Sequence, residues 1–143
     1  MKLKFVFFML WVVLAPAMFS SIAAAELRLF KDFKADVPAG WRVIDEGGHV
    51  VFSAPDESAV VTVTIQAARN MSAQGIAETM SKGLKGTEPV WDEGSGGYIF
   101  DFISNEKLPG KALVKVYNGT ALVLAIMGDN PEVDALVRSM GDK

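Results

Sequence analysis

The sequence of 143 residues contains no cysteine. This absence excludes disulfide bridges, thiolate nucleophiles, zinc–thiolate centres and iron–sulfur clusters together. Histidine is almost as scarce, because His49 is the only one in the chain. Any zinc site would therefore depend on carboxylates. Without covalent cross-links, the fold must be stabilised by packing, and a domain of this length buries enough surface for that.

Clustered basic charge is also lacking. The chain carries 14 Lys and Arg against 17 Asp and Glu. Lys2 and Lys4 fall within the first 25 residues, which leaves 12 basic and 17 acidic side chains in the remainder, a net charge of −5. Nucleic acids and anionic membrane surfaces are bound through clustered Lys and Arg. We therefore expect no nucleic-acid partner, and contact with a membrane only if the first 25 residues are retained.

Residues 1–25 have the pattern of a secretory signal peptide. Lys2 and Lys4 precede an apolar run over residues 5–14, and Ala23-Ala24-Ala25 closes the segment. A positive start, an apolar middle and a small-residue ending are typical of such peptides. We expect cleavage after Ala25, a mature chain that begins at Glu26, and a periplasmic location.

The alternative is that this segment stays in place as a membrane anchor. Residues 5–25 carry no charge and are about long enough to span a bilayer, although Pro16 and the Ser/Ala tail make the second half weakly apolar. No cysteine follows the apolar run, which excludes a lipidated N-terminus. Residues 26–143 are 118 residues long and are expected to form one domain.

Short strands separated by turn residues dominate residues 26–128. The strongest signal is AVVTVTIQA at 59–67, where Ala59, Val61, Val63 and Ile65 alternate with more polar residues. The segment 121–127 is apolar throughout and predicts a central strand covered on both faces. Further strands are predicted at 26–36 (a short edge strand and lead-in), 41–44, 49–53, 88–92, 98–103 and 112–117, with hairpin turns at Gly47-Gly48 and Asn118-Gly119 and a loop at 104–110.

Two segments have helical periodicity. The first is capped by Ser72, carries Ile76, Met80 and Leu84 on one face, and is expected to end at Gly86. The second is expected to begin with Asn130 as cap and Pro131 at the first helical position, and its apolar stripe is Val133, Leu136, Val137 and Met140. The order of strands, helix, strands and helix, with tight turns between strands, predicts an α+β fold: a mostly antiparallel β-sheet flanked by two helices.

Several of these features together resemble the superfamily of PsbP-like proteins. They are Phe33 followed by Val37-Pro38-Ala39-Gly40-Trp41, the strand around Val50-Val51-Phe52, the alternating strand, and a closing helix begun by Asn130-Pro131. The resemblance covers residues 30–140 and implies PsbP-like α/β/α layers. The superfamily includes bacterial envelope proteins of the DcrB type. The resemblance implies an accessory or binding role without a shared catalytic motif, so no functional residue is carried over. DcrB-type proteins are often lipid-anchored, whereas this chain lacks the cysteine that such an anchor needs.

His49 is the obvious candidate for catalysis. A catalytic histidine needs a nucleophile and an orienting acid beside it. Asp45 and Glu46 lie across the Gly47-Gly48 turn and could pair with it. We favour a solvent-facing hairpin histidine and predict no catalytic residue, with a small periplasmic hydrolase using His49 and a neighbouring acid as the alternative.

Metal and cofactor sites are not predicted. Asp-Glu pairs occur at 45–46, 56–57 and 92–93, each beside a turn, where acidic residues are commonly solvated. The calcium-loop pattern of alternating ligands with a closing Glu is absent. A phosphate loop would lead from Gly-Lys-Ser/Thr into a helix, whereas a strand follows Gly94-Ser95-Gly96-Gly97.

The remaining candidate is a binding surface. Trp91 and Tyr98 flank the glycine-rich turn, and aromatic side chains beside a flexible loop can form a contact patch. The alternative is that both rings are packing residues. The sequence thus predicts a non-catalytic exported binding or accessory protein, whose partner is another envelope protein or a small ligand, or a membrane-anchored accessory subunit if the leader is retained. The partner surface is predicted at Trp91, Gly94, Gly96, Gly97 and Tyr98.

Overall fold

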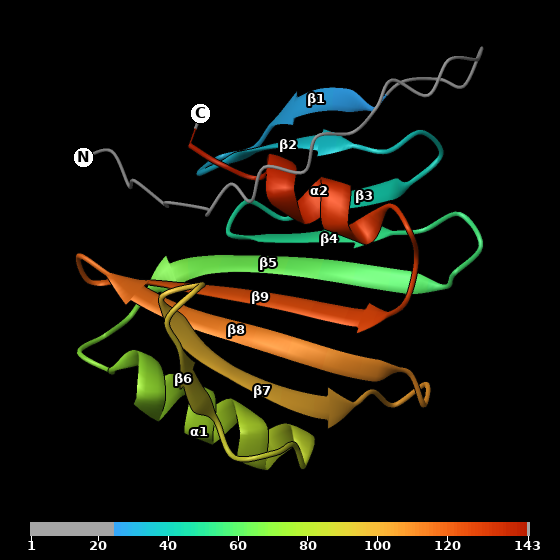
Figure 1. The fold of residues 1–143 in the computed structure, drawn as a ribbon. Helices are drawn as coiled ribbons and strands as arrows, with labels where there is room; N and C mark the ends of the chain where they lie inside the picture. Colours follow the sequence, from blue (N-terminus) through green and yellow to red (C-terminus); the bar gives the residue numbers. More distant parts are fainter. Residues whose placement is uncertain (1–24, 143) are drawn as a thin grey trace.

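The computed structural model describes residues 25–142. Residues 1–24 of the predicted signal peptide lie outside them, so its cleavage after Ala25 stays a prediction. Figure 1 shows a large sheet with one helix toward each end of it. The elements are β1 (Glu26–Leu29), β2 (Lys34–Val37), β3 (Arg42–Asp45), β4 (His49–Ser53), β5 (Ala59–Ala67), α1 (Ala73–Leu84), β6 (Val90–Asp92), β7 (Gly97–Ile103), β8 (Pro109–Tyr117), β9 (Thr120–Gly128) and α2 (Val133–Ser139).

Within residues 25–142, strands β3 to β9 form one seven-stranded sheet in the order β3-β4-β5-β9-β8-β7-β6. Every neighbouring pair of strands in it is antiparallel. The mostly antiparallel α+β fold predicted from the sequence is confirmed. The N-terminal segment differs from the expectation of a single edge strand, because β1 and β2 pair with each other in a separate two-stranded sheet. That small sheet is tied to the end of the chain by paired backbone hydrogen bonds between Lys34 and Gly141.

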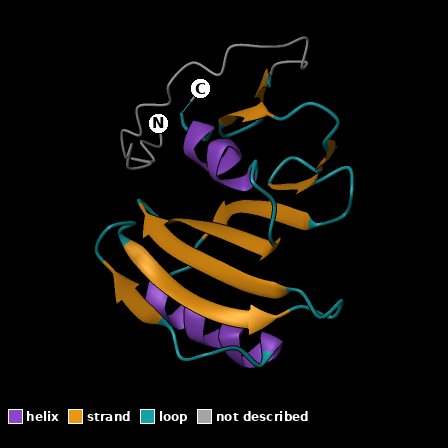
Figure 2. Ribbon diagram, turned by 45° about the vertical axis from the view of Figure 1, so that its right-hand side comes forward, coloured by secondary structure: helices purple, strands orange, loops and turns teal. Residues whose placement is uncertain are grey.

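The helices lie on opposite faces of the sheet (Figures 1 and 2). Helix α2 and the β1–β2 hairpin cover β4, β5 and β9 on one face, where the first hydrophobic cluster forms. Helix α1 covers β7 and β8 on the other face, where the second cluster forms. Each helix therefore covers only part of its face, and the two covered parts are offset along the sheet.

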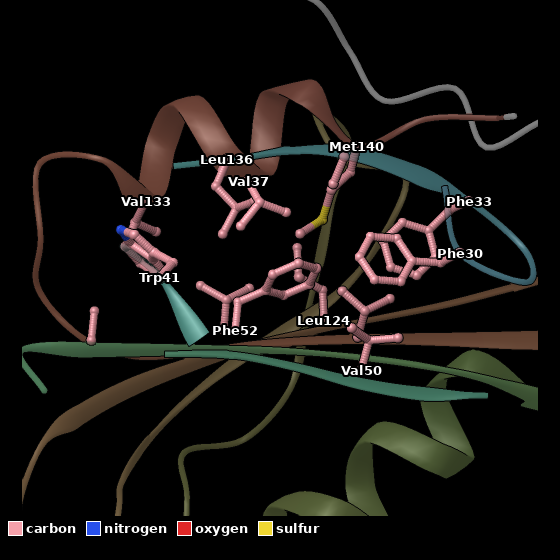
Figure 3. Packing of buried hydrophobic residues seen from close by; sticks show 14 of the residues in the cluster. Phe30, Phe33, Val37, Trp41, Val50, Phe52, Leu124, Val133, Leu136 and Met140 are labelled. Carbon is pink, nitrogen blue, oxygen red and sulfur yellow. The ribbon is translucent and has the colours of Figure 1, made fainter. Parts of the chain in front are cut away.

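The first cluster confirms the alternation predicted for β5. Val61 and Val63 are buried, whereas Thr62 on the opposite face is only half-buried. Phe52 lies in the middle of this cluster, edge-on to Phe30 with ring centroids 5.5 Å apart (Figure 3). Trp41, the expected core anchor, is also buried there. The cluster further contains Phe33, Val37, Val50, Leu122, Leu124, Val133, Leu136 and Met140.

Strand β9 is the fourth of the seven strands and supplies both clusters. Leu122 and Leu124 enter the first cluster, and Val123 and Ala125 enter the second. Because side chains alternate along a strand, a strand covered on both faces must be apolar at every position. The prediction of a central strand over 121–127 is confirmed. Asn118 and Gly119, which join it to β8, both have positive φ (48° and 74°), as a type I′ turn requires.

Helix α1 begins as predicted but ends differently. The Ser72 hydroxyl accepts a hydrogen bond from the Gly75 N–H at 3.0 Å. The left-handed residue at the end is Lys85 (φ 55°), not Gly86. Gly86 is required for close approach instead, since a Cβ there would lie 2.6 Å from the Asp101 carbonyl oxygen. Leu84 was expected on the buried face and is 41% exposed, because the buried helix positions are Ala77 and Ser81.

Several element boundaries in the C-terminal half also differ from the predicted ones, among them the starts of β8 and α2. Pro109 and Gly110 were expected in a loop but begin β8, where they pair with Ile103 and Phe102. Helix α2 starts at Val133 rather than at Pro131, although the Asn130 side chain accepts a hydrogen bond from the Glu132 N–H at 2.9 Å. The predicted apolar stripe of α2 is correct, since its members belong to the first cluster or pack against it.

Candidate functional site

The predicted surface pair is brought together on the hairpin of β6 and β7. Trp91 and Tyr98 lie directly opposite each other in the strand register. Their rings meet edge to face, with centroids 5.3 Å apart and planes at 70°. Such a pair contributes about 0.5–1.5 kcal/mol beyond the area that it buries. The geometry fixes the orientation of both rings.

The two rings differ in exposure. Trp91 is 54% exposed on the edge strand β6. Tyr98 is half-buried and packs against the second cluster, with its hydroxyl 3.5 Å from the side-chain oxygen of Gln74 on α1. Trp91 is therefore the more exposed ring of the pair, and Tyr98 is the ring that contacts the body of the domain. Gln74 was missed by the sequence analysis, since nothing about a polar helix position signals such a contact.

The glycine-rich turn between the strands is pinned by Asp92. The Asp92 carboxylate accepts hydrogen bonds from the Ser95 N–H at 3.0 Å and from the Ser95 hydroxyl at 2.5 Å. These bonds hold the pKa of Asp92 below its usual value. The Gly96 N–H donates to the Asp92 carbonyl oxygen at 2.8 Å. The expected flexible loop is thus a closed turn, and the Asp-x-x-Ser spacing was the sequence signal for it.

The three glycines of the predicted surface have different roles. Gly96 has a positive φ of 72°, which the turn requires. Gly97 is buried at the start of β7, where a Cβ would lie 2.5 Å from the Val114 carbonyl oxygen and 2.8 Å from Cγ of Lys115. Gly94 has room for a side chain, because a Cβ there would lie no closer than 3.8 Å to another heavy atom, the Asp92 Oδ2. The carbon stem of Lys115 lies close to Gly97, and burial lowers the pKa of the Lys115 amine.

His49 lies away from this surface, and its partner is not an acid. Its ring nitrogen Nδ1 is 2.8 Å from the Thr64 hydroxyl on the neighbouring strand β5. The ring is half-buried, not fully solvent-facing as expected. Asp45, the expected acidic neighbour, accepts a hydrogen bond from the Gly47 N–H instead. The structure thus places His49 opposite Thr64 on the adjacent strand.

The aspartate of each acidic pair accepts hydrogen bonds within a turn. Asp45 and Asp92 accept turn N–H groups as described, and Asp56 accepts both the N–H and the hydroxyl of Ser58. The bonds from Ser58 hold the pKa of Asp56 below its usual value. Over residues 25–142, no group of three or more His, Asp or Glu side chains is gathered in a way that could hold a metal ion. No helix in that range is long and apolar enough to span a membrane.

No family model and no curated protein sequence matches the chain. Among solved structures, it is similar to the solution structure of cyanobacterial PsbP (CyanoP) from Synechocystis sp. PCC 6803, at 15% identity over 90% of this chain and 99% of that one, with a TM-score of 0.50. A crystal structure from Bacteroides thetaiotaomicron VPI-5482 aligns at 13% identity with a TM-score of 0.42. That alignment covers 78% of this chain, which spans less than half (45%) of the Bacteroides chain. The described domain has a PsbP-like fold.

Proposed function

We propose that this chain is an exported, non-catalytic binding or accessory protein of a bacterial envelope, and that it captures its partner through Trp91. The observation that carries the proposal is an exposed tryptophan fixed in orientation by Tyr98 on a pinned hairpin. Tryptophan is the residue most enriched among side chains that dominate binding energy, and a rigid aromatic loses little entropy when it is buried by a partner. The partner is another envelope protein or a small ligand.

A binding role also agrees with how the reactive side chains are used. Asp45, Asp56 and Asp92 accept hydrogen bonds within turns, and His49 contacts Thr64. A hydrolase built on His49 would need a carboxylate to orient the ring and a nucleophile to activate. The PsbP-like fold of this domain also agrees with the accessory or binding role that the resemblance to PsbP-like proteins implies. Kinship with DcrB-type envelope proteins remains part of this proposal.

Export is the second part of the proposal and rests on residues 1–25. The mature protein should begin at Glu26, which an intact-mass measurement on the periplasmic fraction checks. A membrane-bound protein whose mass includes residues 1–25 would show that the leader is kept as an anchor, and the protein would then be a membrane-tethered accessory subunit.

The binding proposal is tested by capture from a native envelope extract with immobilised protein. Trp91→Ala should lose partners that the unchanged protein retains. Ile103→Ala is the matched control, because Ile103 is 61% exposed and points to the opposite face of the sheet from Tyr98. Equal loss in both variants, or no loss in Trp91→Ala, would refute the proposed surface.

The alternative that the protein is a hydrolase using His49 is tested with the variant His49→Ala. His49→Ala should leave partner capture unchanged, and the unchanged protein should show no His49-dependent hydrolysis of model ester and peptide substrates. If a hydrolytic activity were found that His49→Ala abolishes and Trp91→Ala does not, the hydrolase alternative would replace the binding proposal.

A further inference from the structure

A hollow of about 430 Å³ lies on the second-cluster side of the sheet, between α1 and the end of β5. The residues used below are Gln66 from β5, Arg69 and Met71 from the connecting turn, and Ile76, Thr79 and Met80 from α1. Its volume is at the lower end of the range for ligand pockets, about 300–1,000 Å³. Nothing in the proposed function uses this hollow.

The hollow and the Trp91 surface lie on different flanks of α1. Gln74 is the helix residue that approaches Tyr98, whereas Ile76, Thr79 and Met80 line the hollow. At 100° per residue, Thr79 lies about 140° around the helix from Gln74. A ligand in the hollow would therefore not compete directly with a partner at Trp91.

The turn that carries Arg69 has an unusual backbone. Arg69 and Asn70 both have positive φ, at 51° and 64°. The turn is closed by the Met71 N–H, which donates to the Ala68 carbonyl oxygen at 3.0 Å, and is fixed by the Ala68 N–H, which donates to the Gly119 carbonyl oxygen at 2.8 Å. Glycine is the favoured residue for such a conformation, and arginine there is strained. Glu57, Lys85 and Lys107 have positive φ as well, so the relevant property of this turn is that its hydrogen bonds hold Arg69 beside the hollow.

The lining combines one cation with a soft apolar wall. Among the described residues that line the hollow, Arg69 is the only charged one. Met71 is 45% exposed, and Ile76 and Met80 are half-buried against the second cluster. Methionine adapts its shape to alkyl chains, and a guanidinium binds carboxylates and phosphates through paired hydrogen bonds. The charge and the apolar wall are complementary to a ligand with one anionic head and an alkyl tail.

We infer that this hollow binds a small anionic amphiphile, with its head group on Arg69 and its alkyl chain along Met71, Ile76 and Met80. Gln66 and Thr79 supply further hydrogen-bonding groups at the margin. The head group is a carboxylate or a phosphate, since a guanidinium can form two parallel hydrogen bonds with either.

The binding test uses the whole protein with decanoate and decyl phosphate as separate probes, below the concentration at which either forms micelles. Isothermal titration gives the dissociation constants, and the head group that binds more tightly is thereby identified. Signals of ¹³C-labelled methionine methyl groups report the location. Those of Met71 and Met80 should shift, whereas that of Met140, which is buried in the first cluster, should not.

Head-group recognition is tested with matched arginine variants. Arg69→Gln should weaken binding of either anionic probe about tenfold or more, as expected for loss of a charge-assisted hydrogen bond. Arg42→Gln should leave binding unchanged, since Arg42 is exposed on the edge strand β3 and does not line the hollow. Decyltrimethylammonium should bind far more weakly than decanoate.

Arg69→Gly separates binding from folding. It relieves the strained backbone, so the thermal midpoint should stay the same or rise while anionic-probe binding falls as in Arg69→Gln. Shifts of the Met71 and Met80 methyls without dependence on Arg69, equal affinity for the cationic probe, or no shift with either anionic probe would each overturn the inference. Partner capture through Trp91 should be unchanged in both Arg69 variants, so failure of one proposal is distinguishable from failure of the other.

Discussion

Val63 and Thr62 are neighbours on β5 that point to opposite faces of the sheet. Val63 is buried in the first cluster, and Thr62 is half-buried on the other face. We predict that Val63→Ala lowers the free energy of unfolding by about 1–3 kcal/mol through lost burial and a residual cavity, and that Thr62→Ala lowers it by less than about 1 kcal/mol. Urea denaturation of both variants measures the difference. Equal losses would mean that both faces of β5 are packed alike.

Gly97 and Gly94 form a second matched pair, within the candidate surface. A Cβ on Gly97 would collide with the Val114 carbonyl oxygen and with side chains of β8, whereas a Cβ on Gly94 meets nothing closer than 3.8 Å. Gly97→Ala should therefore cost about 1–3 kcal/mol, the usual range for overpacking a filled site, and should displace the β6–β7 hairpin. Gly94→Ala should be close to neutral. Thermal unfolding measures the cost, and a neutral Gly97→Ala would contradict the close approach of β7 to β8.

At the scale of the element, the β6–β7 hairpin depends on one carboxylate. Hydrogen bonds from Ser95 hold the pKa of Asp92 below its usual value of 3.8. A carboxylate whose pKa is lower in the folded state contributes stability that is present above 3.8 and is lost as the pH falls through the lowered folded value. We predict that Asp92→Asn is less stable than the unchanged protein at pH 7 and that the difference shrinks below pH 3.8. A difference that is constant with pH would contradict the role of the charge.

The elements that were predicted most accurately are those whose sequence has one clear hydrophobic pattern. Strand β5 alternates cleanly, so its ends at Ala59 and Ala67 were predicted as observed. Strand β9 is apolar at every core position because it serves two clusters. The end of α1 was misplaced by one residue because Lys85, rather than the adjacent glycine, accepts the left-handed conformation. Tertiary packing overrides local preference there, since Gly86 is needed for its approach to β7.

The two surface sites differed in how far the sequence could reveal them. Trp91 and Tyr98 stand at equivalent distances from the middle of a glycine-rich turn, so the hairpin pattern alone brought them together. The hollow beside Arg69 had no comparable signal. Arg69 and Asn70 have positive φ in its turn, whereas a glycine at either position would have indicated a positive φ from the sequence. The helix residues of its apolar wall have, in the sequence, the spacing of ordinary core positions.

For the whole molecule, the shared strand β9 should make unfolding a single event. The two clusters lie on opposite faces and meet only through the sheet, with β9 contributing to both. Trp41 reports on the first cluster, and Trp91 lies beside Tyr98, which packs on the second. We predict that, in each variant that keeps only one of these two tryptophans within residues 26–143, the denaturation midpoint from tryptophan fluorescence coincides with that from far-ultraviolet circular dichroism. Two separate transitions would show that the halves unfold independently.

The position of β9 in the chain also bears on the order in which the protein can fold. Its partner β5 ends at Ala67, whereas β9 ends at Gly128. At about 5–20 residues per second of synthesis, roughly 3–12 s separate the appearance of these two ends from the ribosome. Until then β5 has an open edge and neither cluster is complete, because both need β9. A chain that emerges N-terminus first therefore cannot complete either cluster before the residues of β9 have appeared, and an incompletely folded chain is the state that the proposed export would require.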